Sequence, residues 1–213
     1  MAKFDRILNI FFPKRCLFCR TITEQTVCHA CTETYILKEP ACKRGKYFER
    51  CIAPMRYHGA VRDALLRFKF SGERSCAESF AVWMAKAVRD HYADMFDVVT
   101  WVPVSPERLH ERGYDQAEIL ADALCRQLHI GKAVRLLHRT ISGKRQSHTN
   151  SAAERARNIR ESFSVDPHIP VAGLRVLIVD DIITTGNTLE ECACTLRENG
   201  AVCVLCVCVA TSR

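Results

Sequence analysis

Apolar and polar residues follow two rhythms along this chain, one typical of strands and one typical of helices. Strand-like apolar runs cover 52–57, 98–104 and 176–179, and an alternating run covers 202–210. Helical spacing covers 60–70, 76–92 and a stretch that ends near residue 129. The run 176–179 is continuous, apolar and bounded by charge, which is typical of a strand covered on both faces of a parallel sheet.

The segment after this strand predicts a helix with a defined start and stop. Apolar residues recur at helical spacing over 189–196, and Asn199-Gly200 is a typical helix stop. The turn 184–188 therefore leads into a helix N-terminus, where free backbone N–H groups and the positive end of the helix dipole attract anions. The turn is a candidate phosphate cradle with three hydroxyls, from Thr184, Thr185 and Thr188.

Two carboxylates stand beside this cradle. Asp180 and Asp181 fall at the carboxyl end of the predicted strand, where open α/β sheets bind ligands. Adjacent acids suit ribose hydroxyls or a magnesium ion, so the plainest interpretation is a site for a sugar with a terminal phosphate. An ordinary βα turn remains the alternative. A P-loop nucleotidase is excluded, because the sequence lacks G-x-x-x-x-G-K-[ST].

Two arginines follow the strand predicted at 98–104, which Pro103 interrupts. Arg108 and Arg112 lie in the connection S-P-E-R-L-H-E-R-G-Y-D-Q-A. They are candidates to hold pyrophosphate, because guanidinium groups match phosphate oxygens. The alternative is that they only cap a loop.

Thirteen cysteines in a chain of 213 residues suggest a metal site. The spacing C-x2-C-x8-C-x2-C suits the tetrahedral thiolate shell of structural zinc, with Cys16, Cys19, Cys28 and Cys31 as ligands. Cys42 and Cys51 belong to no C-x2-C pair and predict no complete second site. Cys203 and Cys206 lie three residues apart on a predicted strand, so their side chains point to opposite faces and cannot share a metal. They read as core cysteines, as do Cys192 and Cys194.

Composition sets the size and the compartment. With 48% hydrophobic residues the chain can bury one good core and has about fifty residues left for a small module. No secretory signal and no bilayer-spanning stretch occurs in the sequence, so we expect a cytoplasmic protein whose cysteines are thiols or metal ligands.

The net charge of +7 is concentrated in two segments. Residues 1–56 and 132–160 are both strongly basic, which predicts polyanionic ligands, although an ordinary solvated surface remains open for the first. In the first segment, basic residues stand beside Tyr47 and Phe48, whose rings could stack on bases. We therefore expect contacts to single-stranded DNA from Lys43, Arg44, Lys46 and Arg50.

Two further segments predict structure outside the sheet. Apolar residues over 4–12 follow helical spacing and end at Pro13, which predicts a short helix that docks on protein, with a membrane surface as the alternative. Residues 139–160 are polar and basic without apolar periodicity, which is typical of a functional lid.

These motifs together resemble known families. The stretch V-L-I-V-D-D-I-I-T-T-G-N-T-L resembles the phosphoribosyl pyrophosphate (PRPP) motif of type I phosphoribosyltransferases. With V-P-V-S-P-E-R-L-H-E-R-G-Y-D-Q-A, R-Q-S-H-T-N-S-A-A-E-R-A-R-N-I-R-E-S-F and the N-terminal cysteines, the whole chain resembles the ComF family of competence-associated proteins. It departs from that family's usual double zinc ribbon, and Asp115 stands where relatives commonly carry Asn.

The resemblance implies a fold and a site. It implies a zinc module over 1–50 and, over 51–213, an α/β domain of the type I phosphoribosyltransferase fold, with a central, mainly parallel sheet and flanking helices. Asp180 and Asp181 would hold the ribose hydroxyls, with Mg²⁺, at the catalytic centre. The loop residues Thr184, Thr185, Gly186, Asn187 and Thr188 would hold the 5-phosphate.

The resemblance also implies a role in natural transformation or in the use of imported DNA. PRPP and single-stranded DNA would then be ligands, and a competence helicase or other DNA-uptake proteins would be partners. A phosphoribosyltransferase activity is expected, with an unknown acceptor. The alternatives are a salvage phosphoribosyltransferase with a purely structural zinc module, and a PRPP-responsive regulator without catalysis.

Overall fold

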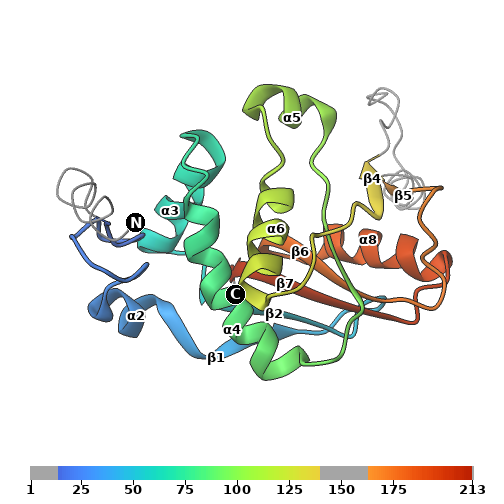
Figure 1. Cartoon of the computed structure of the whole chain (residues 1–213), viewed down its shortest axis with the longest axis horizontal. Helices are drawn as coiled ribbons and strands as arrows, with labels where there is room; N and C mark the ends of the chain where they lie inside the picture. Colours follow the sequence, from blue (N-terminus) through green and yellow to red (C-terminus); the bar gives the residue numbers. More distant parts are fainter. Residues whose placement is uncertain (1–13, 140–162, 213) are drawn as a thin grey trace, which may run out of the picture.

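The computed structural model describes residues 14–139 and 163–212. The helix expected over 4–12 and nearly all of the lid expected over 139–160 lie outside the described residues. The remaining segments form one five-stranded sheet, a small two-stranded sheet and the helices that cover them (Figure 1).

The main sheet has the strand order β1-β2-β7-β6-β3. Its strands are β1 (Ile36–Lys43), β2 (Arg50–Arg56), β3 (Val98–Trp101), β6 (Arg175–Ile183) and β7 (Cys203–Thr211). Only β1 is antiparallel to its neighbour, and the other pairs are parallel. The prediction of a mainly parallel sheet is therefore confirmed. β3 is shorter than the predicted 98–104, since Pro103 cannot donate to a ladder.

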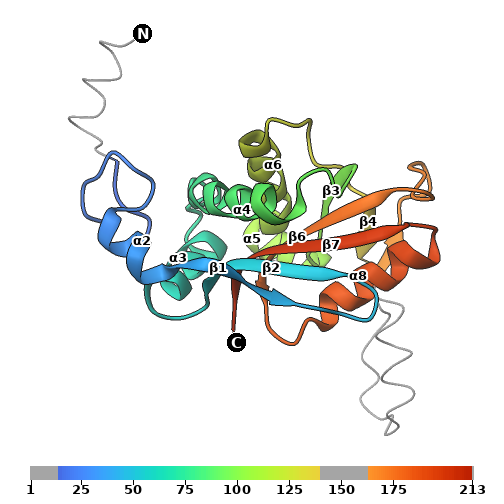
Figure 2. The same ribbon diagram turned by 90° about the horizontal axis from the view of Figure 1, so that it is seen from below.

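Helices cover both faces of this sheet. Figure 2 shows α4 and α6 on one side and α8 on the other. The described helices are α2 (His29–Tyr35), α3 (Gly59–Phe70), α4 (Cys76–Tyr92), α5 (Pro106–Arg112), α6 (Gln116–Leu128) and α8 (Asn187–Glu198). The small sheet pairs β4 (Leu137–Arg139) with β5 (Phe163–Val165). Among the described residues, no helix has the length and apolar character needed to cross a membrane.

Side-chain alternation along the central strands divides the core in two. Leu177 and Val179 pack with α3, α4 and α6, whereas Val176 and Ile178 pack with α8. The same alternation separates Cys203, which packs against the first cluster, from Cys206, which lies in the second. These two cysteines point to opposite faces, as their spacing predicts.

The N-terminal segment is tied to the sheet and to α3. The boundary predicted after residue 50 falls at the first residue of β2, which pairs with β1 in the same sheet, so 36–43 contribute an edge strand. Arg67 on α3 donates to the carbonyl of Leu17 at 2.6 Å. Nη2 of Arg20 donates to both carboxylate oxygens of Glu73, at 2.6 and 2.7 Å, in the loop after α3. The division into two domains stays a prediction.

Candidate functional site

The phosphate-cradle segment forms a tight turn between β6 and α8. β6 extends through both acids to Ile183, so Asp180 and Asp181 belong to the last residues of the strand rather than following it. Gly186 then takes a left-handed conformation, with φ of 92°, and caps α8. Residues with a side chain avoid this backbone region, which explains why glycine stands there. The side chains of Thr184, Thr185, Asn187 and Thr188 are exposed around it.

The two acids face different neighbours. Asp180 lines the small hollow that residues 182–189 enclose. Its Oδ1 accepts a hydrogen bond from the backbone N–H of Asp181 at 2.8 Å. Burial raises the pKa of Asp180 to about 8, and the charge of Asp181 adds to this shift. The site is therefore short of positive charge, and a divalent cation would supply it.

Asp181 already has a cationic partner. Its Oδ2 lies 2.6 Å from Nζ of Lys69 at the end of α3, and both side chains are largely buried. Sequence reasoning missed Lys69. The available signal was a single lysine between two phenylalanines at the end of an otherwise amphipathic helix.

A second lysine, Lys43 at the end of β1, contacts the turn itself. Lys43 Nζ donates to the carbonyl of Thr184 at 3.3 Å and to that of Thr185. A Cβ placed on Gly186 would lie 3.4 Å from the same ammonium. Lys43, predicted as a DNA contact, is thus engaged with the turn and half-buried.

The connection 44–49 of the β1–β2 hairpin, called the hairpin below, is held against α8. Glu190, in the first turn of α8, accepts hydrogen bonds from the backbone N–H groups of Lys46 at 2.6 Å and Tyr47 at 2.9 Å. The other predicted DNA contacts differ in their surroundings. Arg44 and Lys46 are exposed, whereas Arg50 is half-buried with its guanidinium 5.5 Å from the centroid of the Tyr92 ring.

The expectation that Phe48 stacks on bases is wrong. Phe48 is only 2% exposed and lies in the core cluster beneath α8. Tyr47 remains half-buried, with Lys46 Nζ 4.9 Å from its ring centroid. The hairpin therefore offers two exposed cations, Arg44 and Lys46, and one accessible ring.

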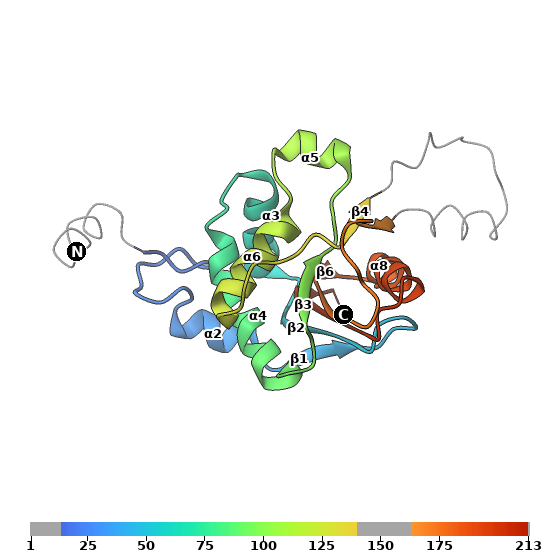
Figure 3. The same cartoon turned by 45° about the vertical axis from the view of Figure 1, so that its right-hand side comes forward.

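The two arginines predicted to hold pyrophosphate lie on α5, which projects from the body (Figure 3). Arg108 is exposed, and its backbone N–H donates to the Ser105 cap at 3.4 Å. Arg112 donates to Gln116 and stacks over the ring of Phe70, 4.8 Å from the centroid. The structure therefore brings Arg112 to Phe70, the last residue of α3.

Asp115 has a structural task. Its Oδ1 caps α6 by accepting from the backbone N–H groups of Ala117 and Glu118, at 3.0 and 3.3 Å. Its Oδ2 accepts from Trp101 Nε1 at 3.2 Å and from Val104 N at 3.1 Å. The residue is 5% exposed. Four donors converge on one carboxylate, which an amide would satisfy less well.

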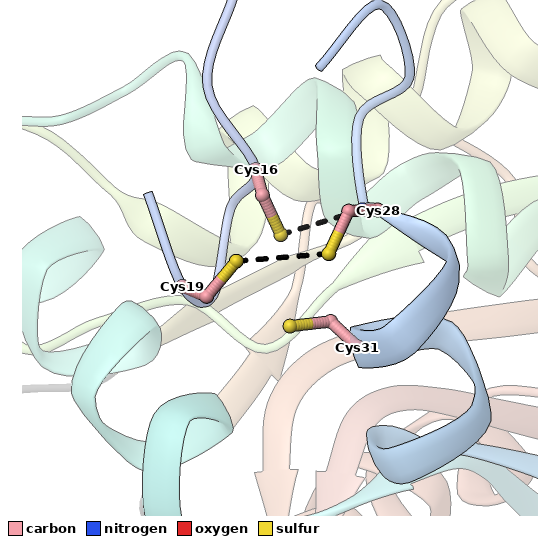
Figure 4. Close-up of side chains that lie close together, drawn as sticks. All are labelled: Cys16, Cys19, Cys28 and Cys31. Carbon is pink, nitrogen blue, oxygen red and sulfur yellow. Dashed lines mark hydrogen bonds between the residues drawn. The ribbon is translucent and has the colours of Figure 1, made fainter. Parts of the chain in front are cut away.

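The four paired cysteines form a compact cluster (Figure 4). Their Sγ atoms all lie within 4.8 Å of one another, and those of Cys19 and Cys28 are 3.6 Å apart. Tetrahedral zinc–thiolate bonds of about 2.3 Å require sulfurs about 3.8 Å apart. A hydrogen bond with Thr21 also lowers the pKa of Cys19 to about 6, which favours the thiolate. The cluster fits a structural zinc ion.

No second cluster accompanies it in the part of the chain that the structure describes. Cys42 is exposed, while Cys51 is buried with its Sγ 3.7 Å from that of Cys208. Cys192 and Cys194 are buried, as predicted.

Comparison with known proteins agrees with this architecture. Residues 114–213 match the phosphoribosyl transferase domain, and residues 7–59 match the double zinc ribbon domain. DNA utilization protein YhgH of Salmonella typhimurium is 36% identical over 167 residues, covering 76% of this chain and 72% of that protein. YhgH of Escherichia coli K12 is 29% identical over 198 residues, covering 88% and 86%.

A relative from another organism shares the same pattern. Competence protein ComFC of Bacillus subtilis is 30% identical over 144 residues, covering 68% of this chain and 56% of that protein. The mainly parallel sheet, the acidic end of β6, the turn between β6 and α8 and the four-cysteine cluster all accord with these matches. The chain therefore belongs to the ComF family, with a type I phosphoribosyltransferase fold behind an N-terminal zinc-ribbon module.

Proposed function

We propose that this protein binds PRPP with Mg²⁺ in the cytoplasm and acts in natural transformation or in the use of imported DNA. The observation that carries the proposal is the turn between β6 and α8, where exposed hydroxyls and a helix N-terminus meet a largely buried acidic pair. The names of the relatives, DNA utilization protein and competence protein, support the biological setting.

Each part of the turn has a role in this proposal. The 5-phosphate would accept hydrogen bonds from the first N–H groups of α8 and from Thr184, Thr185 and Thr188. Asp180 and Asp181 would hold the ribose hydroxyls with Mg²⁺, which lowers the cost of two adjacent charges. Lys43 positions the turn by binding its carbonyls.

We further propose that transfer of the phosphoribosyl group is possible at this site, with the acceptor unidentified. The sugar becomes cationic as pyrophosphate leaves, so a catalyst needs anion clamps and a positioned acceptor more than a covalent residue. Arg112 and Arg108 on α5 are the proposed clamps. Product formation from labelled PRPP and a panel of bases, with and without single-stranded DNA, separates this from a non-catalytic regulator.

The test of PRPP binding uses calorimetry in the presence of Mg²⁺. We expect Asp180→Ala with Asp181→Ala to abolish binding, while Asp63→Ala with Asp90→Ala, two exposed acids with cationic neighbours, leaves it unchanged. Thermal unfolding confirms that each variant is folded. Unchanged PRPP affinity in the first variant would refute the proposed site.

For single-stranded DNA, we propose contacts from the hairpin through Arg44 and Lys46. Neutralising both should weaken binding and make the slope of log affinity against log salt shallower, by roughly 0.7 for each phosphate that is no longer neutralised. Removing the same charge from Arg62 and Lys86, both exposed elsewhere, is the control. If fluorescence anisotropy gives equal affinities for the two variants, the hairpin is not the DNA contact.

A further inference from the structure

Phe70 is the most exposed large apolar side chain of the described residues. It is 67% exposed, and it is the last residue of α3. By contrast Phe18, Phe48, Phe68, Phe80 and Phe163 are at most 6% exposed. Holding an aromatic ring in water gains nothing for the fold, because the hydrophobic effect favours its burial.

The position of Phe70 relates it to the acidic pair. Its neighbour Lys69 reaches Asp181 with Nζ 2.6 Å from Oδ2. Phe70 therefore stands one residue beyond a side chain that contacts the proposed sugar site.

One cationic group lies beside the ring, and a second lies over Tyr114, which contacts the end of α3. The Arg112 guanidinium lies 4.8 Å from the Phe70 centroid, and the Arg74 guanidinium lies 4.5 Å from the centroid of Tyr114. Within the described residues, no carboxylate pairs with either arginine. Tyr114 is tied to the end of α3, because its hydroxyl donates a hydrogen bond to the carbonyl of Phe68. An exposed ring beside a guanidinium group that no carboxylate neutralises is the composition of surfaces that stack bases next to phosphates.

We infer that Phe70, flanked by Arg112, is a stacking site for an unpaired nucleobase close to the sugar site that Lys69 contacts. This inference deepens the proposed function and rests on it for the identity of the neighbouring sugar. The base could belong to single-stranded DNA or be a free acceptor base, and both present the same flat π-face. A lipid or a protein partner fits less well, because a single exposed ring is too small an apolar patch.

The first experiment places a reporter at the ring. Phe70→Trp adds an exposed indole to the native Trp83 and Trp101, and its fluorescence is followed on titration with oligothymidylate, with an abasic oligonucleotide of equal length and with free nucleobases. Each titration is run with and without Mg²⁺ and PRPP. Val202→Trp, at a position 57% exposed before β7, is the matched control, and the wild type supplies the background.

We expect quenching of the Phe70→Trp signal that exceeds the control. Quenching by oligothymidylate but not by the abasic strand assigns the site to single-stranded DNA. Quenching by free bases only with Mg²⁺ and PRPP assigns it to an acceptor base. If neither ligand quenches, or if Val202→Trp responds equally, the inference is overturned. An emission of the Phe70→Trp indole already shifted to the blue without ligand overturns it as well, because part of the chain would then cover the ring.

The second experiment removes the ring. Phe70→Ala should weaken binding of the quenching ligand about tenfold, as expected when one base stack is removed. The salt slope for DNA should stay unchanged, because no charge is removed. Calorimetry should give PRPP affinity within about twofold of the wild type. If PRPP fails to bind the wild type, the proposed function is wrong, while the oligothymidylate titration still decides the role of Phe70. Unchanged ligand affinity in Phe70→Ala overturns the stacking site.

Discussion

Replacement of Lys69 by methionine tests how the acidic pair is held in the absence of ligand. The side chain keeps its approximate length and loses its charge, so the substitution mainly removes the ion pair with Asp181. The two side chains are 18% and 16% exposed, and their charged atoms are 2.6 Å apart. At an effective dielectric constant of about 20, the direct attraction is about 6 kcal/mol.

Desolvation offsets much of this attraction, and removal of one partner from a buried pair typically costs about 3 to 5 kcal/mol. Because both side chains keep some contact with water, we expect Lys69→Met to lower the free energy of unfolding by about 3 kcal/mol. The effect should depend on pH. Lys69 lowers the pKa of Asp180 from the still higher value that burial and Asp181 would give, so the variant retains a proton more strongly.

The sign follows from linkage. A carboxyl group whose folded pKa is raised contributes stability that is full below its ordinary pKa and is lost as the pH rises through the folded pKa. The difference between variant and wild type should therefore be smaller near pH 5 and should grow toward pH 9. Urea denaturation at several pH values measures it.

Lys86→Met is the matched control. Lys86 pairs with Asp90 at the same 2.6 Å, but the two side chains are 62% and 49% exposed. Such a surface pair contributes about 0.2 to 1 kcal/mol. Equal destabilisation in the two variants, or a destabilisation at Lys69 that does not change with pH, would refute the claim that burial makes the Lys69 contact matter.

Three further outcomes are expected. Metal analysis should find one zinc ion per chain, and Cys28→Ser should lose it together with part of the thermal stability; zinc well below one per chain in a folded protein would contradict the assignment. Affinity for PRPP with Mg²⁺ should rise with pH through about 8, because Asp180 must release its proton, and Asp180→Asn should bind weakly at every pH by calorimetry. Asp115→Asn should lower the free energy of unfolding by about 2 kcal/mol in urea denaturation, because the amide N–H would face the N–H groups of Trp101 and Val104. An unchanged midpoint would mean that water accepts the hydrogen bonds of these two N–H groups instead.

The regular elements of the fold could be predicted because they follow local periodicity. Helices α3 and α4 match the predicted 60–70 and 76–92 within one residue, since their apolar faces repeat at helical spacing. β6 and β7 read as strands because each holds a continuous apolar run that is buried on both faces. The strand ends differ from the prediction, since β6 runs on to Ile183 and β3 stops at Trp101. The edge strand β1 was not predicted, because its pairing with β2 rather than an apolar run defines it.

The candidate site likewise combines local motifs, which could be predicted, with contacts between distant residues, which could not. The cysteine spacing and the turn between β6 and α8 are short segments whose function depends on neighbours within a few residues, so the sequence by itself determined them. The positions of Lys43 and Lys69 depend on residues 141 and 112 positions away along the chain. No local pattern encodes such separations.

The surroundings of the charged and aromatic residues in the hairpin could not be predicted from sequence, because they too depend on distant segments. Four basic residues in and beside the hairpin look alike in the sequence but differ in their surroundings. Lys43 binds the turn between β6 and α8, and Arg44 and Lys46 face solvent. Arg50 lies over the ring of the buried Tyr92. Phe48 and Phe70 are likewise the same residue type, one in the core and one in water. Local spacing in the sequence determined the main strands and helices, the thiol cluster and the turn between β6 and α8. Tertiary packing alone decided which lysines contact that turn and its acids and which rings are buried, because burial is set by contacts between distant segments.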